Sequence, residues 1–359
     1  MTARTAASYH AGMLPAPVEA SPERLTAMLR SAGVLGRDQV VDVAVESSRD
    51  TVLSRITRLR LTYGHAADDA PAHVFWKSQR EGVLPLWQEF GRREVDFYRL
   101  VAVDTPAGLL PRCYEALVEP AGAWRLVLED LTDSHEPLGQ WPLPPPIERW
   151  HAILEAHARF RAAWWGRARL GRSADESGQI DQEIAAMQTD FAAFADRLGE
   201  RLSRERRRLY ERLIDAAPRL LARYRLHGNL TLVHGDAHVW NALLPRDGGR
   251  DVRLIDWDAW RVDTATDDLA YMIAVHCFPD WRGRHERACL RRYHDAIVGH
   301  GVRGYPFDTL WEDYRRSVLW QITTPMGQAN QGLPPGIWWN HLERIMRAVE
   351  DLDCVELLG

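Results

Sequence analysis

The stretch "LVHGDAHVWNALL" at residues 232–244 places a histidine, an aspartate, a second histidine and an asparagine between two apolar runs. Side chains this polar rarely stand beside apolar segments without a partner or a chemical role. The following segments, "NALL", "PRDGGRD" and "VRLID", read as strand, turn and strand, with a Gly-Gly pair at the apex. Symmetric pairing about these glycines predicts that Asn241 faces Asp256 across a hairpin, and that Asp236 lies in the loop that enters it.

Oxygen ligands gathered in this way predict a magnesium site. Mg²⁺ prefers hard oxygen donors, keeps some of its waters and shares its coordination shell with substrate phosphates. Asn241 and Asp256 would be its ligands, and Asp236 would be left to orient a hydroxyl group and take its proton. This set of groups suits phosphoryl transfer, in which catalysis is mainly positioning and charge neutralisation.

His234 and His238 leave an alternative open, in which they join Asp236 and Asp256 in a metallo-phosphoesterase site. The two histidines do not lie on a predicted helix, and the sequence offers no further ligand-rich segment for a two-metal hydrolase. We therefore interpret His234 as a structural histidine that braces the loop, and His238 as an exposed one.

Composition limits the broad class of protein. A chain of 359 residues, 46% of them hydrophobic, is long enough for two lobes, and a net charge of −5 gives no field that recruits nucleic acid or an anionic membrane. Four scattered cysteines without CxxC spacing, and the lack of a signal-like or membrane-length apolar run, indicate a soluble cytoplasmic protein. The basic run "RERRR" at 204–208 is interpreted as a solvated helix face.

The order of elements predicts an α+β fold with two lobes. Residues 1–22 read as a leader, and residues 23–133 as a small lobe with an antiparallel sheet. Five prolines between 137 and 146 mark a boundary. Beyond it, residues 134–359 read as a larger, mostly helical lobe.

The small lobe supplies a candidate cation for phosphates. Lys77 ends a predicted strand in "HVFWKS", and Glu94 shares one face of the next helix with Phe97 and other aromatic residues. A buried carboxylate requires a cationic partner, for which Lys77 is the natural candidate and Arg93 the alternative. A lysine held by a glutamate and aimed at nucleotide phosphates is the arrangement found in protein kinases.

These motifs resemble the aminoglycoside phosphotransferase and choline kinase superfamily, whose fold is protein-kinase-like. The stretch at 232–244 is similar to its HGD-x4-N catalytic loop, and "LIDWD" to its counterpart of the kinase DFG motif. "FWK", "REVDFY", "LVLEDL" and "DDLAYMIA" are similar to its choline-kinase-like and ecdysteroid-kinase-like branch. The resemblance runs from residue 23 to the C-terminal helices, nearly the whole chain.

The resemblance implies a kinase that moves the γ-phosphate of ATP to a hydroxyl of a small molecule with the help of Mg²⁺. It implies a hinge near 129–131 whose backbone binds adenine, and an aspartate, Asp268, that braces the catalytic loop. The implied site residues are the catalytic Asp236, the metal ligands Asn241 and Asp256, the phosphate-holding pair Lys77 and Glu94, and the hinge residues Glu129, Asp130 and Leu131. For Asp258, metal ligation remains an alternative equal to solvation or an indirect contact to the site.

One departure from the superfamily concerns the loop that covers the phosphates. The segment "SSRDT" at 47–51 contains no glycine, so Ser47 and Ser48 are expected to take over phosphate contacts. This departure leaves a nucleotide-binding pseudokinase or regulatory module as the alternative function. A protein kinase is less favoured, because no "APE" motif follows Asp256.

The acceptor pocket is expected in the helical lobe, and the sequence leaves its chemistry open. Acidic residues there would suit a cationic aminoglycoside or choline-like group, and tryptophans would suit a larger apolar alcohol such as a sterol or polyketide. The acidic candidates are Asp263, Asp267, Glu312 and Asp313, and the tryptophans are Trp311, Trp320, Trp338 and Trp339.

Overall fold

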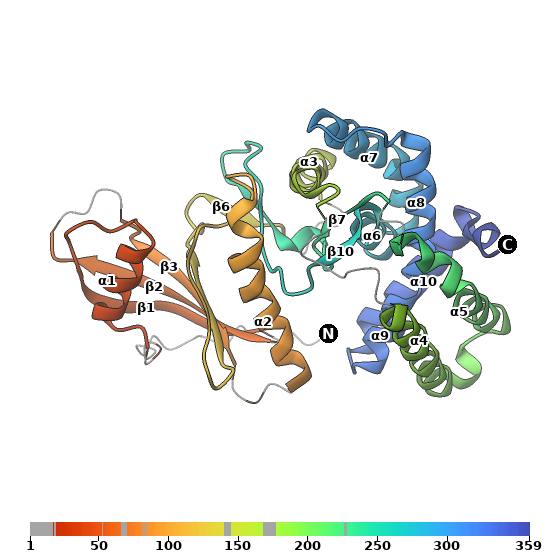
Figure 1. Ribbon diagram of the computed structural model, residues 1–359, viewed down its shortest axis with the longest axis horizontal. Coiled ribbons are helices and arrows are strands. Elements are labelled where there is room, and N and C mark those ends of the chain that lie inside the picture. Colours follow the sequence, from red (N-terminus) through yellow and green to blue (C-terminus); the bar gives the residue numbers. More distant parts are fainter. Residues whose placement is uncertain are drawn as a thin grey trace, which may run out of the picture. The chain divides into compact units, whose positions relative to one another are not determined.

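The structure, a computed structural model, divides the chain into two compact units (Figure 1). The first unit comprises Met1–Arg99 and Pro111–Asp133, and the second comprises Leu100–Leu110 and Ser134–Gly359. Most of the predicted leader lies outside the described residues. These are 17, 19–51, 53–65, 70–80, 82, 85–139, 145–167, 177–225 and 228–359.

The first unit contains an antiparallel sheet of five strands in the order β1-β2-β3-β5-β4, which confirms the predicted antiparallel sheet. The strands are β1 (Val40–Asp50), β2 (Ser54–Tyr63), β3 (His73–Gln79), β4 (Cys113–Val118) and β5 (Trp124–Glu129). Strand β4 was not predicted, because "CYEALV" has no clear alternation of apolar and polar residues. It forms the edge of the sheet beside β5.

Two helices pack on opposite faces of this sheet. Helix α1 (Pro22–Ser31) begins after Ser21, whose hydroxyl accepts a hydrogen bond from the Arg24 N–H at 3.3 Å. Its apolar residues share a core cluster with Trp76 of β3. Lys77, the next residue along β3, therefore lies on the other face. Helix α2 (Pro85–Leu100) belongs to that face, where it supplies Glu94, the ion-pair partner of Lys77.

The close approach of α2 to the sheet depends on a glycine. A Cβ atom built on Gly91 of α2 would lie 1.9 Å from the Trp124 ring of β5. Only a residue without a side chain fits there, so "EFGRREV" is a packing motif as well as a helical one.

The second unit is mostly helical, as predicted. Its helices are α3 (Ile147–Trp164), α4 (Ser177–Leu198), α5 (Arg204–Arg225), α6 (Ala265–Ala270), α7 (Pro279–Gly299), α8 (Phe307–Trp320), α9 (Thr323–Asn330) and α10 (Pro335–Asp351). Its short strands are β6 (His135–Pro137), β7 (Leu230–Val233), β8 (Ala242–Pro245), β9 (Arg253–Leu254) and β10 (Arg261–Thr264). Strands β6, β8 and β9 form one small sheet, and β7 and β10 form another. Figure 1 shows β7, β10 and α6 close together within this unit.

Two local features interrupt the regular helices of this unit. Helix α4 ends at Leu198, because Gly199 adopts a positive φ of 53°. A π-helical turn, Tyr271–Val275, continues directly from α6. Among the described residues, no helix combines the length and the apolar character needed to cross a membrane.

Candidate active site

The ion pair expected in the first unit is present. Lys77 Nζ lies 2.6 Å from Glu94 Oε2, and the side chains of Lys77 and Glu94 are only 12% and 2% exposed. Strand β3 brings Lys77 to the face of the sheet that α2 covers. Glu94 lies on the buried side of α2, where its neighbours Val95 and Phe97 are fully buried. The pairing compensates the cost of burying the carboxylate, and it holds the lysine side chain in one place.

The segment expected as the hinge is held by hydrogen bonds and one ion pair within the same unit. The Glu129 N–H donates to the Arg112 carbonyl at 2.8 Å, and Glu129 Oε2 accepts from the Arg112 N–H at 3.0 Å. Asp130 accepts from Thr132 and from Arg58 Nε, the latter at 2.5 Å. Burial opposes ionisation of Asp130, but these hydrogen bonds prevail and lower its pKa. Leu131 is buried.

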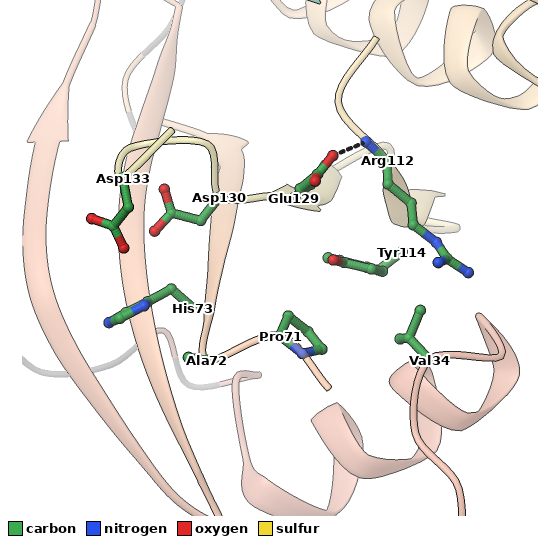
Figure 2. Close-up of a pocket in the computed structure, with 9 residues that line it drawn as sticks. All are labelled: Val34, Pro71, Ala72, His73, Arg112, Tyr114, Glu129, Asp130 and Asp133. Carbon is green, nitrogen blue, oxygen red and sulfur yellow. Dashed lines mark hydrogen bonds between the residues drawn. The ribbon is translucent and has the colours of Figure 1, made fainter. Parts of the chain in front are cut away.

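A cavity of about 380 Å³ borders the hinge (Figure 2). Figure 2 shows Glu129 and Asp130 above Tyr114 and Pro71, with Val34 at one side. Val34 and Tyr114 pack against the core cluster of α1, so this cavity lies on the face of the sheet opposite to Lys77. We therefore do not assign the nucleotide to it.

The segment expected as a phosphate loop is not a loop. Ser47 and Ser48 lie inside strand β1, opposite Arg58 and Thr57, and the Ser48 hydroxyl lies 3.0 Å from that of Thr57. The turn to β2 is closed by Thr51, whose hydroxyl accepts from the Ser54 N–H at 3.0 Å. Because the segment has no glycine, strand β1 continues to Asp50. The turn that follows is stabilised by the hydrogen bonds of the Thr51 hydroxyl.

The loop of the second unit that the resemblance implies to be catalytic is anchored through its backbone by Asp268, as expected. Asp268 Oδ2 accepts from the His234 N–H at 2.7 Å, and Oδ1 accepts from the Gly235 N–H at 2.8 Å. Arg161 donates to Oδ2 at 2.6 Å, and both side chains of this pair are fully buried. Burial alone would raise the pKa of Asp268, but the Arg161 charge and the loop donors lower it strongly. A permanent negative charge thus fixes the loop.

His234 braces the loop as predicted. Its Nε2 lies 2.8 Å from the Ile255 carbonyl oxygen, and because a carbonyl only accepts, Nε2 carries the proton. Its Nδ1 accepts from the Asp236 N–H at 3.3 Å. Burial lowers the pKa of His234, so the ring is neutral and both nitrogens are already in use. This arrangement does not suit a metal ligand.

The Asp236 carboxylate is held by three side chains. Tyr271 donates its hydroxyl hydrogen to Oδ1 at 2.7 Å, and Asn241 Nδ2 donates to Oδ2 at 3.1 Å. His238 Nε2 lies 3.4 Å from Oδ2. His238 is not the exposed histidine that the sequence suggested, since its ring packs beside Trp240. Sequence reasoning missed Tyr271, although it stands three residues after Asp268 in "DDLAYMIA".

The register of the hairpin differs by one residue from the prediction. Ala242 pairs with Leu254, so Asn241 falls opposite Ile255, whose N–H donates to the Asn241 carbonyl at 3.0 Å. The predicted symmetry fails because the turn closes on Gly248 alone, which has a φ of 76°. Asp256, the residue after Ile255, has a φ of 68°, a left-handed conformation that is uncommon outside glycine.

The chemistry of Asn241 and Asp256 fits a divalent cation. Asn241 Nδ2 donates both to the Asp236 carbonyl at 2.9 Å and to its carboxylate, so the amide is oriented with its oxygen free of protein donors among the described residues. Asp256 adds a carboxylate in a strained backbone conformation, which is typical of functional positions. No cluster of three or more His, Cys, Asp or Glu side chains in the described part of the chain could hold a metal.

The acidic residues considered for a cationic acceptor already have partners. Arg261 forms ion pairs with Asp263 and Asp267, and Arg316 forms ion pairs with Glu312 and Asp313. Asp263, Asp267 and Asp313 are also buried. Of the four C-terminal tryptophans, Trp338 is buried and the other three are partly exposed.

Comparison with known proteins identifies the type of fold. A model of the ecdysteroid kinase-like family matches residues 81–301. A search of curated protein sequences gave no match.

Solved structures align over most of the chain. A candidate aminoglycoside phosphotransferase from Ralstonia eutropha JMP134 has a TM-score of 0.57 at 15% identity, with 92% of this chain and 96% of that chain covered. The gentamicin complex of aminoglycoside phosphotransferase APH(2'')-IIa has a TM-score of 0.51 at 12% identity, with 93% and 97% covered. The streptomycin and ATP complex of that enzyme has a TM-score of 0.50 at 13% identity, with 90% and 94% covered. This likeness confirms the predicted α+β, protein-kinase-like fold.

Proposed function

Because the chain belongs to the ecdysteroid kinase-like family, we propose that it is a small-molecule kinase that transfers the γ-phosphate of ATP to a hydroxyl group. The observation that carries the proposal is that side-chain donors fix the Asp236 carboxylate. The backbone of its loop is in turn anchored by Asp268, which forms a buried ion pair with Arg161. A carboxylate held in this way is suited to orient an alcohol and accept its proton. The family and the solved relatives support nucleotide-dependent transfer as the reaction class.

Each predicted residue has a role in this proposal. Lys77, held by Glu94, neutralises charge on the donor phosphates. Asp236 accepts the hydrogen bond of the acceptor hydroxyl and takes its proton as the new oxygen–phosphorus bond forms and the nucleoside diphosphate leaves. Asn241 and Asp256 would hold Mg²⁺, which supplies charge neutralisation at the phosphates when bound.

The hinge and the β1–β2 turn would receive the rest of the nucleotide. The backbone of Glu129 to Leu131 is the proposed contact for adenine, and its position is stabilised by the Arg58–Asp130 ion pair at 2.5 Å. Ser47 and Ser48 remain candidates for phosphate contacts, from strand β1. Since Thr51 replaces glycine backbone at the turn, phosphate binding there would depend on side chains.

The acceptor is proposed to be an alcohol without a requirement for positive charge. The four acidic residues that would attract an aminoglycoside or an amino alcohol are already paired with arginines. Next to Asp236 the chain instead offers the ring side chains of Tyr271 and His238, and Trp240 packs beside His238. These rings add apolar contact area but no anionic partner for a polycation such as an aminoglycoside.

Transfer of label from [γ-³²P]ATP tests the proposal. The protein would be incubated with Mg²⁺ and a panel of steroids, sugars, amino alcohols and aminoglycosides. We expect labelled product from uncharged alcohols in preference to aminoglycosides. Stabilisation by Mg·ATP without transfer to any alcohol would favour the nucleotide-binding regulatory alternative, for which the glycine-free turn is the specific observation.

A further inference from the structure

Tyr271 makes the shortest hydrogen bond to the proposed catalytic carboxylate, and no motif assigned it a role. Its hydroxyl hydrogen is donated to Asp236 Oδ1 at 2.7 Å, compared with 3.1 Å for the bond from Asn241 to Oδ2. His238 also lies on the Oδ2 side, at 3.4 Å. Oδ1 therefore receives one hydrogen bond, from Tyr271, whereas Oδ2 is approached by two side chains, Asn241 and His238.

The local fold places Tyr271 for this contact. Asp268, which anchors the loop backbone at His234 and Gly235, lies in α6 three residues before Tyr271. Tyr271 itself opens the π-helical turn. π-Helical turns are rare, and they are frequently found at functional sites. One continuous element therefore holds both the backbone of the catalytic loop and its carboxylate.

His276 supports Tyr271 from the other side. Its Nδ1 lies 2.9 Å from the Tyr271 carbonyl oxygen, and the two ring centroids are 4.6 Å apart. Burial lowers the pKa of His276 well below its usual value, so the ring is neutral and donates through Nδ1. The ring of His341 packs against that of His276, with 4.6 Å between the ring centroids. The tyrosine therefore has little freedom to leave the carboxylate.

The tyrosine remains a donor at every working pH. Burial and the neighbouring charge of Asp236 raise the pKa of Tyr271 well above its usual value. Its hydroxyl therefore keeps the hydrogen that it donates.

We infer that Tyr271 is a positioning residue for phosphoryl transfer, which fixes the Asp236 carboxylate so that Oδ1 faces the acceptor hydroxyl. A carboxylate offers about four acceptor directions, two on each oxygen. Oδ2 is occupied by Asn241 and faces His238, whereas Oδ1 keeps one direction open beside Tyr271. The inference rests on the proposed function, and it adds the oxygen that reacts and the group that orients it.

The test compares Tyr271→Phe with Tyr314→Phe. The first variant removes the donor and keeps the ring against His276. The second, in α8, removes a buried tyrosine–carboxylate hydrogen bond of 2.6 Å to Glu286, away from the catalytic loop. We expect Tyr271→Phe to lower kcat by about 10- to 100-fold with an unchanged KM for the nucleotide, since only the geometry of the reacting carboxylate is altered. Tyr314→Phe should keep the parent kcat per folded molecule.

A double-mutant cycle on stability keeps the test independent of turnover. Tyr271→Phe and Asp236→Ala should be non-additive, with a coupling of about tenfold in the unfolding equilibrium constant. Additive effects, or a Tyr271→Phe variant with the parent kcat, overturn the inference. Failure of the proposed function would give a different result, because the parent protein itself would transfer no phosphate. The stability coupling between Tyr271 and Asp236 would persist in that case, but the role of Tyr271 in phosphoryl transfer would be refuted.

Discussion

Gly235, at the centre of the catalytic loop, should tolerate no side chain. Its φ is 82°, and a Cβ built there lies 2.1 Å from the Ala259 carbonyl oxygen and 2.6 Å from an Arg261 guanidinium nitrogen. The nearest contact is backbone, so relief requires a shift of the loop or of the segment leading into β10. We expect Gly235→Ala to damage both stability and activity.

The magnitude follows from two contributions. A left-handed conformation costs an L-residue about 1–2 kcal/mol, and overpacking against a rigid neighbour costs about 1–3 kcal/mol. The expected loss in the free energy of unfolding is therefore about 2–5 kcal/mol. Relief of a contact this short moves the chain by roughly 1 Å, and a misplacement of that size can lower kcat by about 100-fold.

Urea denaturation and steady-state kinetics measure the two effects separately. Gly283→Ala is the matched control, because Gly283 lies in α7 with nothing within 4 Å of the added Cβ and no positive φ. That control should gain about 0.5–1 kcal/mol, since alanine is the better helix former. A Gly235→Ala variant as stable and active as the parent would refute the steric reasoning.

Three further predictions concern buried ionisable side chains. Lys77→Met should lower the free energy of unfolding by about 3 kcal/mol, since it removes the lysine partner of the buried Glu94 carboxylate; a denaturation midpoint equal to the parent's would contradict this. Asp268→Asn should cost about 3–5 kcal/mol in the same assay, because the fully buried Arg161 loses its counter-charge, and an unaffected variant would mean that the pair does not anchor the loop. Burial, followed by neighbouring positive charge, lowers the pKa of His341 to about 4, so its contribution to stability is complete above the unfolded-state value near 6.5 and is lost as pH falls from there towards 4. Between pH 6.5 and 4, the free energy of unfolding of the His341→Asn variant should therefore fall by about 2 kcal/mol less than that of the parent. An equal decrease in both proteins would show that His341 is not buried as a neutral ring.

The elements that sequence patterns predicted well are those whose pattern is local. Alternating residues in "LSRITRLRLTY" specify β2, and the Ser21–Pro22 pair specifies the start of α1. The Lys77–Glu94 pair was also predictable, since a glutamate on an apolar helix face must find a cation.

The features that the sequence did not reveal depend on contacts between distant segments. The tyrosine that holds Asp236 lies 35 positions further along the chain, and only the path through α6 brings Tyr271 back to the loop. The predicted hairpin register was wrong for a related reason, because the centre of a turn depends on which residue adopts a positive φ. The sequence offers two adjacent glycines for this conformation, and in the structure it is Gly248 that adopts it.

The acceptor chemistry was also open, because a sequence does not show which acidic residues already have partners. Arg261 forms ion pairs with both Asp263 and Asp267, and no periodic pattern in the sequence predicts that one arginine pairs with two aspartates. Pairing of this kind is a property of the folded chain.

The Asp236→Asn variant tests the central claim most directly. Asparagine keeps the size of the side chain and an oxygen for the Tyr271 hydroxyl, but it cannot take a proton from an alcohol. Transfer of label from [γ-³²P]ATP should fall by about 100-fold or more, while stabilisation of the protein by Mg·ATP stays at the parent level. Transfer at the parent rate by this variant would contradict the account.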